Sequence, residues 1–188
     1  MPRAGLTTDR VADEAWALMD GGAALSLAAV AARVGVRVPS LYKHVTSLDA
    51  LHQLVAVRAK VDLGEALTLA VEAASAGAGP DTLVRLAVAY RDWARRHPGL
   101  YSSTLRAPDP TDAADVEASG RASDVIFSAL RLQGLPEDAL IDATRAFRSL
   151  LHGFVAIEAV GGFALPVDVD RSYESIVAVF GRSLREWS

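Results

Sequence analysis

Apolar residues recur at steps of three and four along almost the whole chain, and they do not alternate with polar residues over the length of a β-strand. This spacing places the apolar side chains on one face of a helix and therefore predicts an all-α fold. Glycine and proline interrupt the pattern and divide it into about nine helices. The main ranges expected for them are 8–20, 27–34, 39–45, 47–74, 80–97, 112–133, 137–160 and 170–186.

Two of the expected helices are short and lie on either side of Gly35. Two helices joined by a glycine-containing turn are typical of a helix-turn-helix. Short helices are not stable alone in water, so the first three helices must form a small bundle that supports them from one side. The apolar residues expected to pack there are Leu27, Val30, Val34, Leu41 and Val45, against Val11, Ala15 and Met19.

The opposite face of the second short helix carries groups suited to DNA. Arg37 can donate to guanine, Ser40 can bond to either type of base, and Val38 can touch a thymine methyl group. The donors of the following Tyr-Lys-His run suit phosphate oxygens, as do the open N–H groups after Ser47. A polar face that is simply solvated explains the same residues, and the spacing alone does not choose between the two readings.

Composition limits the other functions. The chain has 188 residues, 51% of them hydrophobic, and no cysteine, which excludes disulfides, thiolate zinc sites and cysteine nucleophiles. The net charge of −4 is unevenly spread, because residues 1–60 carry +2 and residues 61–188 carry −6. This split suits a small module that faces a polyanion on an acidic body. No apolar run is long enough to cross a bilayer, so we expect a cytoplasmic protein without a membrane partner.

An enzyme is the less favoured class. The four histidines, at 44, 52, 97 and 152, include no pair four residues apart that could bind a metal on one helix face. The chain also has no G-x-S-x-G motif, Walker loop or G-x-G-x-x-G motif. We therefore expect no metal, no cofactor and no catalytic residues.

The last two helices and several aromatic residues leave two interpretations open. The stripes on 137–160 and 170–186 fit either one intramolecular core or a four-helix bundle with a second copy. A single recognition helix reads few bases, which favours a two-fold dimer. Large side chains on the central helices fit either core packing or the lining of an apolar cavity.

The stretch LAAVAARVGVRVPSLYKHVTSLDAL, residues 27–51, resembles the DNA-binding domain of the TetR family of transcriptional regulators. Trp93, HPGLY at 97–101 and LLHGFVAIEAVGGFALPVD at 150–168 resemble the Trp/His-Gly type of TetR C-terminal domain. The resemblance implies a DNA-binding domain at 1–50 and an effector-binding and dimerisation domain at 51–188. It assigns operator contacts to Arg37, Val38, Pro39, Ser40, Tyr42, Lys43 and His44, and Ser47, beside the open N–H groups noted above, is expected to contact DNA as well.

The resemblance also implies the function: a homodimeric repressor that binds double-stranded operator DNA and is released by a small-molecule effector. The expected effector residues are Tyr90, Trp93, Tyr101, Phe127, Phe147, Leu151 and His152. The expected dimer interface comprises Leu150, Phe154, Ile157, Ile176, Phe180 and Leu184. One departure is Leu48, where many members have a phosphate-binding lysine. The alternative is a helical ligand-binding or adaptor protein whose helix-turn-helix no longer binds DNA.

Overall fold

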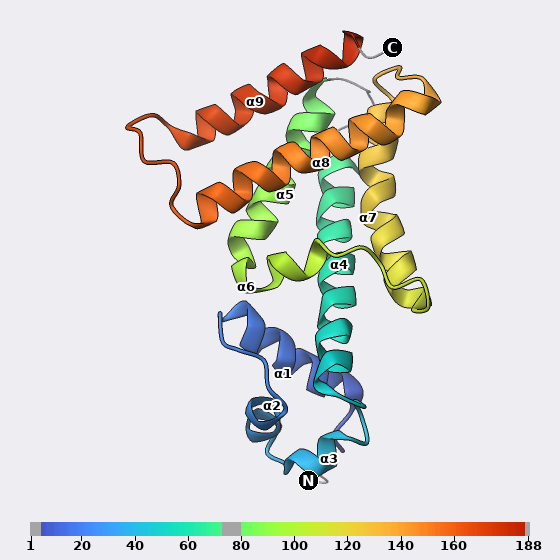
Figure 1. Cartoon of the computed structure of the whole chain (residues 1–188), viewed down its shortest axis with the longest axis vertical. Coiled ribbons are helices and arrows are strands. Elements are labelled where there is room, and N and C mark those ends of the chain that lie inside the picture. Colours follow the sequence, from blue (N-terminus) through green and yellow to red (C-terminus); the bar gives the residue numbers. More distant parts are fainter. Residues whose placement is uncertain (1–4, 73–79, 187–188) are drawn as a thin grey trace. The chain divides into compact units, whose positions relative to one another are not determined.

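The structure, a computed structural model, describes residues 5–72 and 80–186. All regular secondary structure in those ranges is helical (Figure 1). This confirms the all-α prediction, with nine α-helices and two short 3-10 helices among the described residues. The α-helices are α1 Thr8–Asp20, α2 Leu27–Val34, α3 Val38–Leu41, α4 Leu48–Glu72, α5 Pro80–Arg96, α6 Pro98–Tyr101, α7 Ala113–Arg131, α8 Glu137–Ala159 and α9 Val169–Ser183. The 3-10 helices are η1 Ser102–Thr104 and η2 Leu184–Glu186.

The chain forms two compact units. Unit 1 comprises Met1–Lys60 and His97–Val116, and unit 2 comprises Val61–Arg96 and Glu117–Ser188. The chain passes from one unit to the other within α4 and again within α7. The functional boundary expected at residue 50 stays a prediction. The part of helix 47–74 beyond Glu72 lies outside the described residues.

Local capping explains where the first helices of unit 1 begin and end. The Thr7 hydroxyl accepts from the Arg10 N–H at 3.2 Å and caps α1, which begins at Thr8. The Ser26 hydroxyl accepts from the Ala29 N–H at 3.1 Å and caps α2. Gly35 ends α2 in the left-handed conformation, with φ of 74°, which residues with a side chain rarely adopt.

α3 is shorter than predicted, because it ends at Leu41 instead of near Val45. The Leu41 carbonyl accepts from the N–H groups of both His44, at 2.8 Å, and Val45, at 3.0 Å. Residues 42–44 therefore form a tightened turn after a single helical turn. Val45 stays buried, so the apolar anchor of the segment is kept.

A short helix, α6, forms between the helices expected at 80–97 and 112–133, where no helix was predicted. Proline in its first turn is compatible with a helix because the missing N–H is not needed there. α6 packs on α1 so closely that a Cβ on Gly99 would lie 1.7 Å from the Met19 carbonyl oxygen. His97 Nδ1 also lies 3.0 Å from Asp20 Oδ2. The end of α1 is therefore fixed against the start of α6.

The core of unit 2 lies where α5 packs against α8 and α9. Trp93, Phe147 and Tyr173 are almost completely buried. The rings of Phe147 on α8 and Phe180 on α9 stack at 5.1 Å, and the Tyr173 hydroxyl donates to the Ala87 carbonyl at 2.7 Å. These contacts hold α8 and α9 side by side, as Figure 1 shows.

Candidate nucleic-acid interface

The segment 37–47 is anchored from one side. Leu41 has no exposed surface and Val45 is 6% exposed, and α3 packs on α2, which packs on α1. Apolar residues of this kind keep a single helical turn in place, since a helix of four residues has no stability of its own. The opposite side of the segment is consequently held toward solvent.

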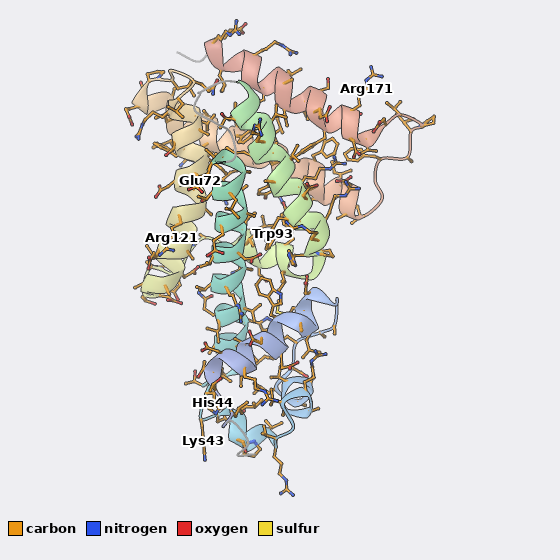
Figure 2. All side chains as sticks on the ribbon, turned by 180° about the vertical axis from the view of Figure 1, so that it is seen from behind. Lys43, His44, Glu72, Trp93, Arg121 and Arg171 are labelled. Atoms are coloured by element: carbon orange, nitrogen blue, oxygen red, sulfur yellow. The ribbon has the colours of Figure 1, made fainter. Side chains whose placement is uncertain are left out.

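The structure places the eight predicted DNA contacts along this one segment. Arg37, Pro39, Tyr42 and Lys43 are exposed, and Val38, Ser40, His44 and Ser47 are half-buried. Tyr42 is 54% exposed, a large fraction for an aromatic side chain. Figure 2 labels Lys43 and His44 next to each other, with the Lys43 side chain extending away from the ribbon.

The Lys and Arg side chains of unit 1 fall into two groups, those in ion pairs and those without one. Arg33 pairs with Glu14 at 2.7 Å, Arg58 pairs with Asp13 at 2.5 Å, and Lys60 is buried against Asp115. Within the described residues, Arg37 and Lys43 take part in no ion pair. The exposed segment therefore carries two cations without acid partners, as a surface that meets phosphates requires.

The start of α4 offers a second kind of anion contact. The Ser47 hydroxyl accepts from the Ala50 N–H at 2.9 Å, and the first backbone bond into the helix runs from the Leu51 N–H to the Ser47 carbonyl. The N–H groups of Leu48 and Asp49 precede that bond and lie at the positive end of the helix dipole. Backbone donors are thus present where Leu48 replaces the expected lysine.

The predicted effector residues are mostly core residues. Trp93, Phe147 and Leu151 are at most 1% exposed, Tyr90 is 6% exposed, and all four lie in unit 2. Phe127 and His152, in the same unit, are half-buried. Tyr101 is buried in unit 1, whereas the other six belong to unit 2.

Sequence reasoning missed a polar contact within this set. The Trp93 indole N–H donates to Asp62 Oδ2 at 2.6 Å, joining α5 to α4 inside unit 2. Asp62 is half-buried, and no spacing pattern connects it to Trp93. The acceptor satisfies the indole N–H, which would otherwise be unpaired in the core.

Residues 83–180 match a family model described as the tetracyclin repressor-like C-terminal domain. The chain is 32% identical over 177 residues to an uncharacterised HTH-type transcriptional regulator of Mycobacterium tuberculosis, Rv0681, covering 93% of this chain and 79% of that protein. It is also 32% identical to YobS, an uncharacterised HTH-type transcriptional regulator of Bacillus subtilis, covering 95% of this chain and 93% of that protein. The chain belongs to the TetR family. The resemblance inferred from residues 27–51 and from the C-terminal motifs is thus confirmed.

Solved structures share the fold of this TetR-family regulator. A protein of unknown function from Rhodococcus sp. RHA1 has a TM-score of 0.81 at 24% identity and covers 97% of each chain. The Streptomyces coelicolor TetR family protein ActR, in complex with actinorhodin, has a TM-score of 0.70 at 20% identity and covers 97% of this chain and 96% of that one. At these identities the likeness supports the fold, and the functional class follows from the family.

The predicted dimer residues of the TetR-family chain divide into two groups. Ile157 and Ile176 are 47% and 40% exposed, and Leu150 is half-buried. Phe180 and Leu184 are 7% and 5% exposed, and the half-buried Phe154 ring contacts the ring of Tyr173. The first group is available to another molecule, whereas the second packs mainly within unit 2.

A charged cluster in unit 2 was also missed by the sequence analysis. Arg91, on α5, donates to Glu158 at the end of α8 and to Asp170 at the start of α9. Its guanidinium also lies 4.8 Å from the centre of the Tyr173 ring. Hydrogen bonds to Glu158 raise the pKa of Arg91 further above its usual value, and the bonds from Arg91 lower the pKa of Glu158.

Two other classes of site receive no support. Within residues 5–72 and 80–186, no group of three or more His, Cys, Asp or Glu side chains is arranged to hold a metal ion. No described helix is both long and apolar enough to cross a membrane.

Proposed function

We propose that this TetR-family regulator is a homodimeric repressor that binds double-stranded operator DNA through α2 and α3 and leaves it when a small-molecule effector binds to unit 2. The observation that carries the proposal is the exposed face at residues 37–44. Arg37, Tyr42 and Lys43 project from a segment that buried Leu41 and Val45 hold from behind. The exposed tyrosine and the two unpaired cations together supply hydrogen-bond donors suited to phosphate oxygens.

The proposed contacts differ in what they read. Arg37 and Ser40 stand at the start of α3, the part of a recognition helix that meets base edges in the major groove. Val38 offers a methyl surface to thymine. Tyr42, Lys43 and His44, in the turn after α3, donate to phosphate oxygens and set the register of the helix on the duplex. Ser47 lies at the open N–H groups of α4, which bind one further phosphate.

A second copy is required because α3 has only four residues. One such helix contacts a few base pairs, which is too little for selectivity against a genome. Two copies related by a two-fold axis place two recognition helices about 34–36 Å apart, one turn of the duplex. We therefore expect the operator to be an inverted repeat with this spacing.

The proposed effector is a largely apolar, aromatic molecule. Phe127 and His152 keep accessible surface, and they lie in the unit that also buries Tyr90, Trp93 and Phe147. The crystal structure of ActR is a complex with actinorhodin, which supports a small-molecule ligand for this fold. Release requires only that the effector bind the DNA-free form more tightly, by about 1–3 kcal/mol of coupling free energy.

The test of DNA binding is selection of bound duplexes from a random pool by the purified full chain. We expect an inverted repeat to emerge, with affinity that falls steeply as salt rises. The variant Lys43→Ala should weaken binding to every sequence. The control Arg121→Ala removes the same charge from an exposed position of α7 in unit 2 and should leave binding unchanged. Recovery of random sequences would support the alternative, a helical ligand-binding protein that does not bind DNA.

The test of regulation uses the selected operator upstream of a promoter in a purified transcription reaction. We expect the protein to reduce transcript yield and an aromatic effector to restore it. Effectors are found by screening aromatic compounds for a rise in the unfolding temperature, since a ligand stabilises the state that binds it. An increase of transcript on adding the protein alone would identify an activator instead of a repressor.

A further inference from the structure

Unit 1 contains a cavity with a polar lining. Its volume is about 280 Å³, whereas a single water molecule takes up about 30 Å³ of the liquid. Ligand sites begin at about 300 Å³, so the size suits a small molecule. The segment from η1 to α7 passes beside α4 (Figure 1), and the cavity lies between them. Its lining residues, all of unit 1, are Gln53, Ala56 and Lys60 of α4, Ser103 of η1, residues 106–109, and Asp115 of α7.

The buried cation of this cavity, Lys60, has donors to spare. Its side chain is 5% exposed, and a lysine ammonium carries three N–H groups. Among the described residues the ammonium bonds to one acceptor, Asp115 Oδ1 at 2.5 Å. A buried charged group is costly unless its remaining donors also find acceptors. Lys60 therefore needs further oxygen atoms, and the cavity is where water or a ligand can supply them.

The walls of the cavity are held in place by the chain itself. Asp115 Oδ2 accepts from Gln53 Nε2 and from the Asp109 N–H, each at 2.9 Å, which fixes the loop against α4. Gln53 Nε2 also lies 3.3 Å from Asp112 Oδ2, whereas the Gln53 side-chain carbonyl accepts from no described residue. A site whose walls are already in position loses little entropy when a ligand binds.

The exposed edge of the cavity adds one charge of each sign. Arg106 is exposed and takes part in no ion pair among the described residues. Asp109 is also exposed, and its Oδ1 accepts from the N–H and the hydroxyl of Thr111. Because Lys60 and Asp115 balance each other, the charges left for a ligand are those of Arg106 and Asp109. A ligand with charges of both signs complements this lining.

We propose that the cavity binds a small zwitterion, an α-amino acid or a molecule of the same chemistry. The ligand carboxylate accepts from the spare N–H groups of Lys60 and from the Arg106 guanidinium. The ligand ammonium donates to Asp109 and to the Gln53 carbonyl. This site goes beyond the proposed function, whose effector is largely apolar and binds in unit 2.

The test is a thermal unfolding screen of the full chain, without DNA, against single amino acids at about 5 mM. At least one should raise the unfolding temperature by about 2 °C or more, and calorimetric titration then gives its dissociation constant. Two relatives of that amino acid divide the contacts. Its amide lacks the carboxylate and its parent carboxylic acid lacks the ammonium, so each should bind at least about tenfold more weakly. A parent acid that binds as tightly would overturn the zwitterion, and a screen without any shift would overturn the site.

Protein variants locate the ligand. Arg106→Gln should raise the dissociation constant about tenfold or more, whereas Arg10→Gln, at another exposed and unpaired arginine of unit 1, should leave it unchanged. Ala56→Leu fills the cavity from α4 without removing a charge and should abolish binding. Circular dichroism and the urea midpoint check that each variant folds.

Binding that survives both Arg106→Gln and Ala56→Leu would place the ligand elsewhere and overturn the proposal. Operator selection is a separate measurement, so its outcome does not decide this one. A chain that binds an amino acid here but selects no operator would keep the site and lose the proposed function. A chain that selects an operator but binds no amino acid would do the reverse.

Discussion

At the scale of single residues, Gly35 and Gly99 are needed for different physical reasons. Gly35 has φ of 74°, a left-handed backbone that glycine adopts without strain, and it ends α2 so that α3 can begin. Gly99 has no such backbone requirement. It is needed because its α-carbon lies against the Met19 carbonyl, where a side chain has no space.

Replacing Gly99 by alanine should therefore destabilise unit 1. The added methyl group would lie 1.7 Å from the Met19 carbonyl oxygen, so α6 must move away from α1. We expect a loss of about 1–3 kcal/mol or more in the free energy of unfolding, measured by urea denaturation. Gly120→Ala is the control, and should be neutral or stabilising by up to about 1 kcal/mol. Equal stability of the two variants would contradict the close approach of α1 and α6.

A second residue-scale feature is the buried pair formed by Lys60 and Asp115, whose side chains are 5% and 3% exposed. Burial raises the pKa of Asp115, but hydrogen bonds from Lys60, the Asp109 N–H and Gln53 outweigh it, so the pKa lies below its usual value. A carboxyl group whose pKa is lowered by folding stabilises the folded state above its unfolded pKa of about 3.9. That stabilisation is lost as the pH falls through the lower, folded pKa.

We expect Asp115→Asn to reduce the free energy of unfolding by about 3–5 kcal/mol at neutral pH, because it leaves the Lys60 ammonium buried without a counter-charge. The variant should also lose part of the acid dependence of stability below about pH 4. Urea denaturation at pH 7, 4 and 3 measures both effects. The exposed pair Asp142–Arg145 supplies the control, Asp142→Asn, with an expected change under about 1 kcal/mol. A small effect of Asp115→Asn would mean that Lys60 finds water or another acceptor.

At the scale of elements, our proposal assigns base reading to α3 and phosphate binding to the turn after it. Arg37→Ala should relax the preference at one base pair in each half-site by about 1–3 kcal/mol, while other positions keep their selectivity. Tyr42→Ala should weaken binding by a similar factor for all sequences. Competition binding with operators changed one base pair at a time distinguishes the two patterns. A uniform loss in Arg37→Ala would reassign that residue to a phosphate.

The sequence predicted the elements more accurately than the packing between them. Periodicity, caps and glycine positions located the long helices to within a few residues, and the family motif located the helix-turn-helix. The α6 helix was not predicted, since four residues after His97 carry no periodic signal and depend on the contact between Gly99 and Met19. The burial of Phe180 and Leu184 within the chain was also beyond the pattern. A helical stripe marks apolar positions, but it does not say whether they face the chain's own core or another molecule.

At the scale of the whole molecule, an acidic chain carries Arg37 and Lys43 without ion pairs on the exposed segment after Gly35. Most of the negative charge belongs to residues 61–188, and several arginines there are already paired with acids. Unit 1 holds the exposed Arg37 and Lys43. A net charge of −4 therefore does not argue against DNA binding, because local cations determine the contact while the rest of the molecule is screened by salt.

The salt dependence of operator binding measures how many copies make these contacts. Each neutralised phosphate contributes about 0.9 to the slope of log affinity against log salt. If two copies bind one operator and each Lys43 contacts a phosphate, Lys43→Ala removes two contacts and should reduce the slope by about 2. If only one copy binds, the variant removes one contact and should reduce the slope by about 1. Arg121→Ala should leave the slope unchanged. Fluorescence anisotropy from 50 to 200 mM salt resolves these values, and an unchanged slope in Lys43→Ala would exclude this lysine from the phosphate contacts.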